Sequence, residues 1–300
     1  MTEQELGILI REAWTALSPH YEPAIECIID ESGLEGRLWG VLLAVLTFEP
    51  DLTTPAHFLV RIPYTAADLY LGRLNSAVQA GYLEEVEPGK FKLSVNGRLE
   101  LNGFIRDARD AMSSANPLSL TESERLTSLL GKLVQSCLDT DPPPDTWSVR
   151  HSFKLMPPMD PPMPYIEQGF SCLSAYRDDA HLAAWKQSGL SATALETLTI
   201  IWRGDAYSLN TLIKKLDYRG HSLRVYADAL DVLRERDYIS GDDDKLVINP
   251  AGRYFRDRVE SDTDGYFFAP WSYLSDSEKV ELGDLLVNLR DGLKTIAPNS

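Results

Sequence analysis

The chain has 300 residues, of which 44% are hydrophobic and 25% are charged, and its formal net charge at pH 7 is −16. This composition excludes large-scale disorder, and the length is sufficient for two domains that each bury a full core. The charge excludes a basic surface over the whole molecule, so any nucleic-acid interface has to be a local feature.

The sequence also bears on the location of the protein. No apolar stretch approaches the roughly 18 residues of a membrane span, and the first residues lack a basic leader, so we expect a cytoplasmic protein with no membrane partner.

The three cysteines, Cys27, Cys137 and Cys172, are far apart and lack metal-ligand spacing. They are typical of buried small apolar side chains and not of a disulfide framework or a zinc site.

The first 138 residues predict helices interrupted by one β-hairpin. Apolar residues recur at spacings of three and four in the helices, and Thr65-Ala-Ala-Asp68 has the form of a capping box at the start of one of them. A Pro88-Gly89 turn between two β-prone runs indicates the hairpin. The predicted elements are helices 2–17, 23–31, 34–48, 55–62 and 65–80, a hairpin over 82–95, and helices 97–112 and 121–138.

Residues 139–164 have the composition of a linker. Eight prolines hold this segment extended and semi-rigid, so we expect it to join two domains without folding by itself. Trp147, Val149, Phe153 and Leu155 lie within it, and we expect part of the segment to pack on a domain surface.

The stretch from Ser208 to Arg258 predicts two helices, a tight turn between them and a short hairpin. Ser208 caps the first helix, Tyr218 to His221 breaks it, and Ser222 caps a second helix whose apolar residues share one face. Residues 238–240 and 245–248 flank an acidic Gly241–Asp244 turn and predict the hairpin. This order of elements is typical of a winged helix-turn-helix.

The chain also repeats itself. Tyr70 and Tyr226, and Tyr82 and Tyr238, are 156 positions apart, while Gly97-Arg98 and Gly252-Arg253 are 155 apart. A match of residues 120–125 with 274–279 gives an offset of 154, and Glu31-Ser-Gly-Leu34 matches residues 187–190 at 156. We therefore predict a mainly α fold with short β-hairpin wings, as two tandem winged helix-turn-helix domains related by pseudo-twofold symmetry. The predicted domains are residues 1–138 and 165–297, joined by the linker 139–164.

Each half resembles the MarR family of bacterial transcriptional regulators. The resemblance rests on the order of elements, on Gly-Arg after each hairpin and on the Ser-Glu opening of the last helix. It implies a DNA-binding regulator in which terminal helices from two subunits intertwine. Since regulators of that family are about half this length and dimerise, the chain is interpreted as a monomer that acts as a fused pseudo-dimer.

The resemblance implies DNA contacts at two recognition helices, residues 65–80 and 222–236. Paired units of this kind occupy successive major grooves about 34 Å apart. The predicted DNA-contacting residues are Arg61, Tyr64, Thr65 and Arg73 in the first half and Lys214, Lys215, Arg219, His221, Ser222 and Arg224 in the second. The two sets differ, so an asymmetric DNA site is expected. The two lysines are equally typical of a solvated helix face.

The hairpins depart from the family pattern. Neither one carries the arginine that the family inserts in the minor groove, and Asp242, Asp243 and Asp244 would repel phosphates. Together with the charge of −16, this leaves open an alternative function. The chain is then a protein-interaction or ligand-binding module that has kept the scaffold and lost DNA binding.

Two further groups of residues have alternative interpretations. The aromatic run from Tyr266 to Tyr273 would floor a pocket for a small aromatic effector with Phe267, Phe268, Trp271 and Tyr273, although core packing is the commoner role of such side chains. The segment from Tyr176 to His181 has the composition of a catalytic or metal cluster, but it lacks a second histidine, and capping and ion pairing fit it better. We expect no catalytic residues, metal site or cofactor, and hence no enzyme.

Overall fold

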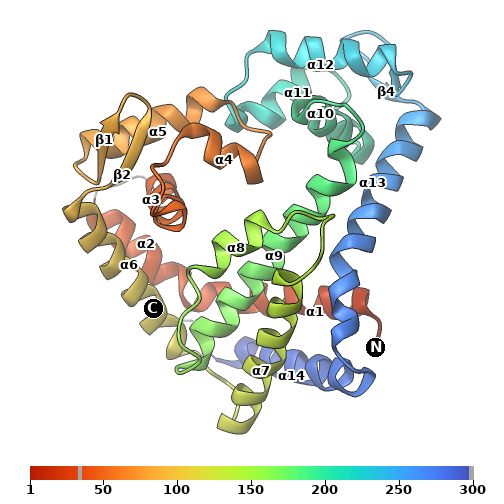
Figure 1. Cartoon of the computed structure of the whole chain (residues 1–300). Helices are drawn as coiled ribbons and strands as arrows, with labels where there is room; N and C mark the ends of the chain where they lie inside the picture. The colour runs from red at the N-terminus through yellow and green to blue at the C-terminus, as the bar shows by residue number, and fades with distance from the viewer. Residues whose placement is uncertain (33–35, 297–300) are drawn as a thin grey trace.

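The computed structural model describes residues 1–32 and 36–296, which form a mainly helical structure with two small antiparallel hairpins (Figure 1). The first half contains α1 (Glu3–Leu17), η1 (Ser18–His20), α2 (Glu22–Ser32), α3 (Gly36–Phe48), α4 (Pro55–Arg61), α5 (Ala67–Gln79), β1 (Leu83–Glu87), β2 (Lys90–Leu93), α6 (Val95–Ser113) and α7 (Leu120–Leu138). The second contains α9 (Pro162–Lys186), α10 (Ala192–Arg203), α11 (Leu209–Leu216), η2 (Asp217–Arg219), α12 (Leu223–Glu235), β3 (Ile239–Ser240), β4 (Val247–Ile248), α13 (Pro250–Phe268), η3 (Ala269–Tyr273) and α14 (Asp276–Thr295). Helix α8 (Trp147–Phe153) lies between the halves. The mainly α class is confirmed, whereas the duplication into two related domains stays a prediction.

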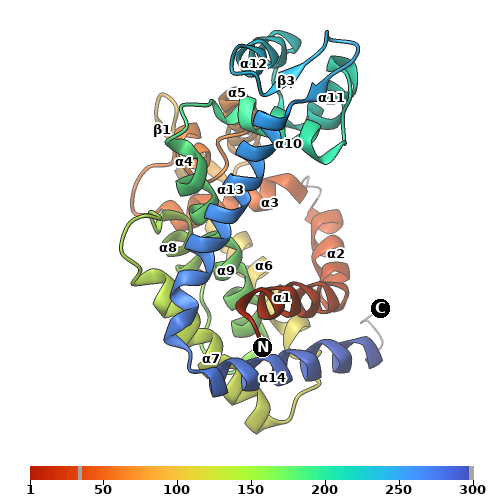
Figure 2. The same ribbon diagram turned by 90° about the vertical axis from the view of Figure 1, so that its right-hand side faces the viewer.

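In the part of the chain that the structure describes, buried apolar side chains form three clusters. One lies in the first hairpin unit, which comprises α3, α4, α5, β1 and β2, and another in the second hairpin unit, from α10 to β4. The third lies in a helical body made of α1, α7, α9, α14 and the adjoining ends of α6 and α13. Figures 1 and 2 show the two hairpin units side by side above this body, with α9 and α13 rising from it to the second unit.

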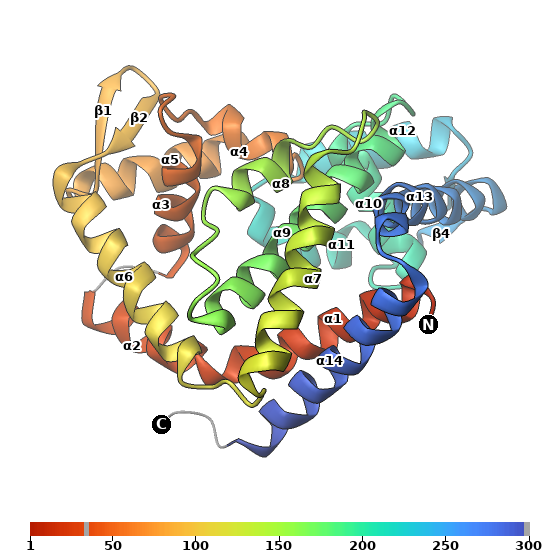
Figure 3. The same cartoon turned by 60° about the horizontal axis from the view of Figure 1, so that its bottom comes forward.

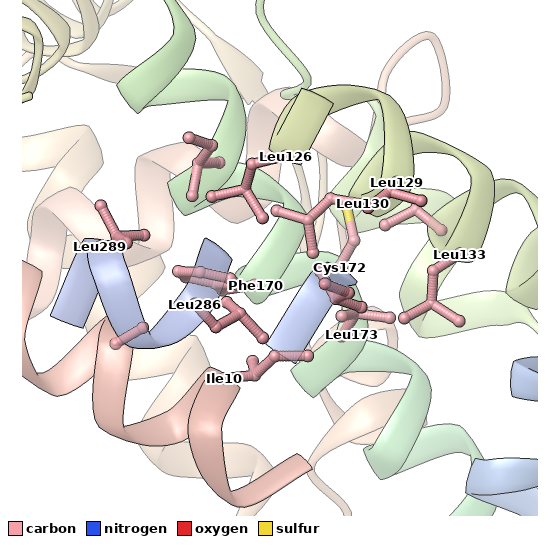
Figure 4. Close-up of a cluster of buried hydrophobic side chains, with 14 of the residues drawn as sticks. Ile10, Leu126, Leu129, Leu130, Leu133, Phe170, Cys172, Leu173, Leu286 and Leu289 are labelled. Carbon is pink, nitrogen blue, oxygen red and sulfur yellow. The ribbon is translucent and has the colours of Figure 1, made fainter. Parts of the chain in front are cut away.

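The core of the helical body takes side chains from both halves. Ile10 of α1, Leu130 of α7, Phe170 of α9 and Leu286 of α14 lie in one buried cluster (Figure 4). Helices α1 and α14, from opposite ends of the chain, pack along each other (Figure 3). Neither half can bury these apolar faces alone, so the two halves depend on each other for stability. No helix in the described ranges is long and apolar enough to span a membrane.

The same backbone contact occurs within each of the two hairpin units. The amide of Ser94 donates to the carbonyl of Tyr82 at 3.0 Å, and that of Asn249 donates to the carbonyl of Tyr238 at 2.9 Å. In each unit a glycine lies close to this carbonyl group. A Cβ added at Gly97 would lie 2.0 Å from the backbone carbonyl oxygen of Tyr82, and one added at Gly252 would lie 2.2 Å from that of Tyr238. The recurrence of a glycine after each hairpin therefore has a steric cause.

One part of the sequence alignment is wrong. The last helices begin with capping boxes in which Ser119 pairs with Glu122 and Ser275 pairs with Glu278. These serines are 156 residues apart, so the offset of 154 aligned the wrong residues, because it paired Ser123-Glu124 with Ser277-Glu278. The match that includes Glu31 to Leu34 falls mostly outside the described residues.

The linker is also not the unfolded connection that its prolines predict. Residues 147–153 form α8, in which Val149 is fully buried against the helical body. Both carboxylate oxygens of Asp179 accept backbone N–H groups at the start of α8, from Ser148 at 2.9 Å and Val149 at 3.0 Å. The carboxylate comes from α9, 30 and 31 residues from the two N–H groups, so nothing in the local sequence indicated this helix.

A carboxyl group in the helical body makes the stability depend on pH. Burial raises the pKa of Glu167 to about 7, although the side chain of Trp14 and the charge of Arg109 oppose the rise. The folded state therefore holds this proton more tightly than the unfolded chain. This contribution to stability is complete below pH 4.5, the ordinary pKa, and is lost as the pH rises through 7.

We expect Glu167→Gln to be more stable than the wild type at pH 8, by on the order of 2 kcal/mol, and to lose this advantage at pH 4.5. Urea denaturation at both pH values measures the difference. Glu100→Gln on the exposed face of α6 is the matched control and should follow the wild type. Parallel stability curves for the wild type and Glu167→Gln would refute the assignment.

Candidate nucleic-acid interface

Residues close in sequence determine where α11 begins and where the turn before α12 lies. The hydroxyl of Ser208 accepts the N–H of Thr211 at 3.2 Å and begins α11. Gly220 follows η2 with φ at 73°, a left-handed conformation that glycine adopts without strain. The hydroxyl of Tyr226 in α12 then donates to the carbonyl of Leu216 at 3.1 Å and links α12 to the end of α11.

The outer face of this pair carries exposed cations. Lys214, Lys215 and Arg224 are exposed. Lys215 and Arg224 make only loose ion pairs, since Lys215 lies 3.9 Å from Asp205 and the 88% exposed side chain of Arg224 lies 3.8 Å from Asp228. Ser222, also exposed, occupies the N-cap position of α12, but its side chain makes no capping hydrogen bond. These four residues are free to contact a phosphate backbone.

Arg219, in contrast, is engaged inside the protein. Its guanidinium donates to the carboxylate of Glu196 at 2.6 and 2.9 Å, with the two side chains only 18% and 11% exposed. A further N–H donates to the hydroxyl of Thr65 at 3.2 Å, and the guanidinium stands 5.5 Å from the ring centre of Tyr64. The residue therefore joins the second hairpin unit to the first.

Further bonds complete this contact between the two units. The N–H of Ala66 donates to the carbonyl of Arg219 at 2.9 Å, and Nε2 of His221 lies 2.9 Å from the carbonyl oxygen of Tyr64. The side chain of Leu69 packs against Gly220. We call this set of bonds the inter-unit contact. The predicted capping box at Thr65 is wrong, because Ala66 takes the N-cap position and the Thr65 hydroxyl accepts from Arg219.

The inter-unit contact sets an upper limit on the distance between the starts of α5 and α12. Ala66 directly precedes the first residue of α5, and three residues lie between Arg219 and Leu223, so the two starts are at most about 25 Å apart. Base contacts come from the N-terminal ends of recognition helices, and successive major grooves require about 34 Å. The expectation that both helices occupy successive grooves is therefore wrong for this arrangement.

The other two predicted contacts of the first half face away from α12. Arg61 donates to Asp178 of α9 at 2.7 Å, and the guanidinium of Arg73 stands 5.6 Å from the ring centre of Tyr70. Both arginines line a cavity between the first hairpin unit and the helical body. The structure thus brings Tyr64, Thr65, Arg219 and His221 together, separates Arg61 and Arg73 from them, and leaves the remaining four on the outer face.

A second cavity, of about 600 Å³, contains most of the predicted aromatic site. Phe267, Phe268 and Trp271 line it, and their ring centres are 4.9 to 5.5 Å apart. Tyr273 does not line the cavity and is 68% exposed, so that part of the prediction is wrong. The opposite wall comes from Trp14 and neighbouring residues of α1, which the sequence did not reveal, because they lie more than 250 residues away.

The acidic segment of α9 is occupied by structural contacts. Asp179 caps α8, Asp178 pairs with Arg61, and Arg177 donates to Asp264 at 2.8 Å. Burial lowers the pKa of His181 to about 4, so this imidazole is neutral at pH 7. No group of three His, Cys, Asp or Glu side chains in the described ranges is placed to hold a metal ion. The interpretation as capping and ion-pairing residues agrees with these contacts.

Comparison with known proteins supports the interpretation of the second half. Residues 155–295 match the model of a helix-turn-helix family. This part of the chain has a helix-turn-helix fold. The match spans α9 to α14 and so includes the exposed face of Lys214, Lys215, Ser222 and Arg224. No curated protein and no solved structure matches the chain.

Proposed function

We propose that the protein is a transcriptional regulator that binds duplex DNA through the outer face of α11 and α12. The observation that carries this proposal is the exposed set Lys214, Lys215 and Arg224 on a helix-turn-helix, in a chain whose net charge is −16. Cations gathered on one face of an acidic protein provide the local attraction that phosphates require.

Binding in this arrangement uses one recognition helix. The inter-unit contact holds the start of α5 against the turn before α12, so the first hairpin unit cannot reach the next major groove. A small aromatic effector in the 600 Å³ cavity would contact α1 from the first half and α13 from the second. Such a ligand would change DNA binding only if it bound more tightly to one arrangement of the two halves than to another.

The double variant Lys214→Glu/Lys215→Glu is expected to lower the affinity for genomic DNA fragments by at least about tenfold at low salt and to reduce the salt dependence. Retention of fragments at several salt concentrations measures both effects. Lys294→Glu, at the far end of α14, makes one similar charge change and should leave binding close to the wild type. Equal losses in both variants would point to net charge and not to this face.

A second function is favoured by the acidic hairpins and the inter-unit contact. The first hairpin exposes Glu84, Glu85 and Glu87, and the turn of the second exposes three aspartates. Four of the ten predicted DNA contacts take part in the inter-unit contact, and Arg61 pairs with Asp178. If the wild type retained no DNA fragment at low salt, the alternative of a ligand-binding or protein-interaction module on a helix-turn-helix scaffold would replace the first proposal.

A further inference from the structure

One apolar residue at the start of α12 is left out of the core. Tyr226, Leu230 and Leu233 of this helix are fully buried, whereas Leu223, at helical spacing from them in the sequence, is 58% exposed. Within residues 1–32 and 36–296, Leu223 belongs to none of the three buried clusters, nor to the half-buried side chains packed against them. Packing in the core therefore does not account for a leucine at this position.

Leu223 and Arg224 are the first two residues of α12, and both side chains are exposed. Side chains at the N-terminal end of a recognition helix are the ones that reach base edges in the major groove. The Cα atoms of consecutive residues are about 3.8 Å apart, which is close to the rise of about 3.4 Å between base pairs. Leu223 and Arg224 can therefore contact neighbouring base pairs.

The two side chains suit different groups on the base edges. The guanidinium of Arg224 has only the loose ion pair with Asp228 to give up, and its N–H donors fit O6 and N7 of guanine in two parallel hydrogen bonds. The side chain of Leu223 has no polar atom and suits an apolar group, which in the major groove is the 5-methyl group of thymine. 5-Methylcytosine carries the same group on the same ring position.

The first hairpin unit lacks both features. Ala67 and Asp68, the first two residues of α5, precede Leu223 and Arg224 by 156 positions and are exposed. The side chain of alanine is a single methyl group, and a carboxylate accepts hydrogen bonds, so it cannot pair with the acceptors O6 and N7 of guanine. Recognition of this kind is therefore confined to α12.

From these features we infer that α12 selects a pyrimidine with a 5-methyl group, through Leu223, next to a guanine bound by Arg224. The inference rests on the proposed function, because it assigns bases to the same DNA-binding face. It adds Leu223, which is not among the ten predicted DNA contacts. Contact between one methyl group and Leu223 should raise the affinity about fourfold.

The test begins with the full chain and a random-sequence duplex library, from which the duplexes that bind at low salt are selected and sequenced. Uracil, which differs from thymine only in the missing 5-methyl group, then replaces each thymine of the selected duplex in turn. We expect one replacement, beside a guanine, to lower the affinity of the wild type about fourfold, as measured by fluorescence anisotropy. Cytosine and 5-methylcytosine at the same position form a second pair, and the tighter of the two methylated bases identifies the preferred source of the methyl group.

Three variants assign the effect to side chains. Leu223→Ala removes the apolar contact and should bind the thymine and uracil duplexes equally. Val232→Ala is the matched control, because it removes an exposed aliphatic side chain farther along the same helix, and it should keep the fourfold difference. Arg224→Gln should weaken the choice of the neighbouring guanine and retain the effect of the methyl group.

Two results would overturn the inference while leaving DNA binding itself in place. One is equal affinity of the wild type for every thymine and uracil duplex and for the cytosine and 5-methylcytosine pair. The other is the same methyl preference in Leu223→Ala as in the wild type. If no duplex were selected at low salt, the proposed function would fail, and the inference would fail with it.

Discussion

Replacement of Glu196 with alanine is expected to lower the free energy of unfolding by about 3 kcal/mol. The carboxylate of Glu196 and the guanidinium of Arg219 are both more than four-fifths buried, and removal of one partner leaves the other charge without compensation. Urea denaturation measures this loss. Arg219→Ala should lower the free energy of unfolding by a similar amount. In the double variant neither charge is left without its partner, so the combined loss should be smaller than the sum of the two single losses.

The same two variants should differ in their affinity for DNA. In Glu196→Ala the inter-unit contact is weakened and Arg219 is released, so the first hairpin unit can separate from the second and a further cation can reach DNA. We expect this variant to bind genomic fragments several times more tightly than the wild type at the same salt concentration. Arg219→Ala weakens the same contact but supplies no cation, and should gain less.

A matched control separates release of the contact from the loss of one negative charge. Glu235→Ala removes a carboxylate from the exposed end of α12, in the same unit, and does not disturb the first half. It should unfold at the wild-type urea concentration and show only a small gain in affinity. If Glu196→Ala bound DNA no more tightly than Glu235→Ala, the inter-unit contact would not restrict DNA binding.

Local signals in the sequence explain why most elements of the second half could be predicted. Ser208, Gly220 and the apolar face of Tyr226 and Leu230 specify a helix, a turn and a helix without help from distant residues. The structure gives α12 as Leu223–Glu235, within one residue of the prediction. The exposed cations of this face were also predictable, because they lie opposite the apolar residues of the same helices.

Contacts between distant residues explain what the sequence did not reveal. Thr65 looked like a helix cap, but its hydroxyl bonds to Arg219, 154 residues away. The basic turn before α12 looked like a DNA-binding surface, but Glu196 neutralises its arginine. Likewise the prolines near α8 indicated an extended linker, while Asp179 and the buried Val149 stabilise a helix there. The spacing of residues along a sequence indicates which side chains share a helix face, but not which distant residues that face contacts.

Gly252→Ala is expected to destabilise the protein by about 3 kcal/mol. A Cβ at this position would lie 2.2 Å from the carbonyl oxygen of Tyr238 and 2.9 Å from its carbonyl carbon. These are backbone atoms, and the oxygen is held in place by the N–H of Asn249 at 2.9 Å. Relief of the clash therefore requires either the hairpin or the start of α13 to move.

Gly265→Ala in the same helix is the matched control. Among the described residues, no atom outside its chain neighbours and the backbone of its own helix would lie within 4 Å of the added Cβ. The main effect is therefore the lower entropy of the unfolded chain, and this variant should be more stable than the wild type by about 0.5–1 kcal/mol. The opposite signs of the two Gly→Ala changes exclude a general effect of helix propensity. Gly97→Ala extends the test to the first hairpin unit, where the added Cβ would lie 2.0 Å from the Tyr82 oxygen. A loss of stability in Gly252→Ala but not in Gly97→Ala would contradict the equivalence of the two units, since both glycines accommodate the same carbonyl group.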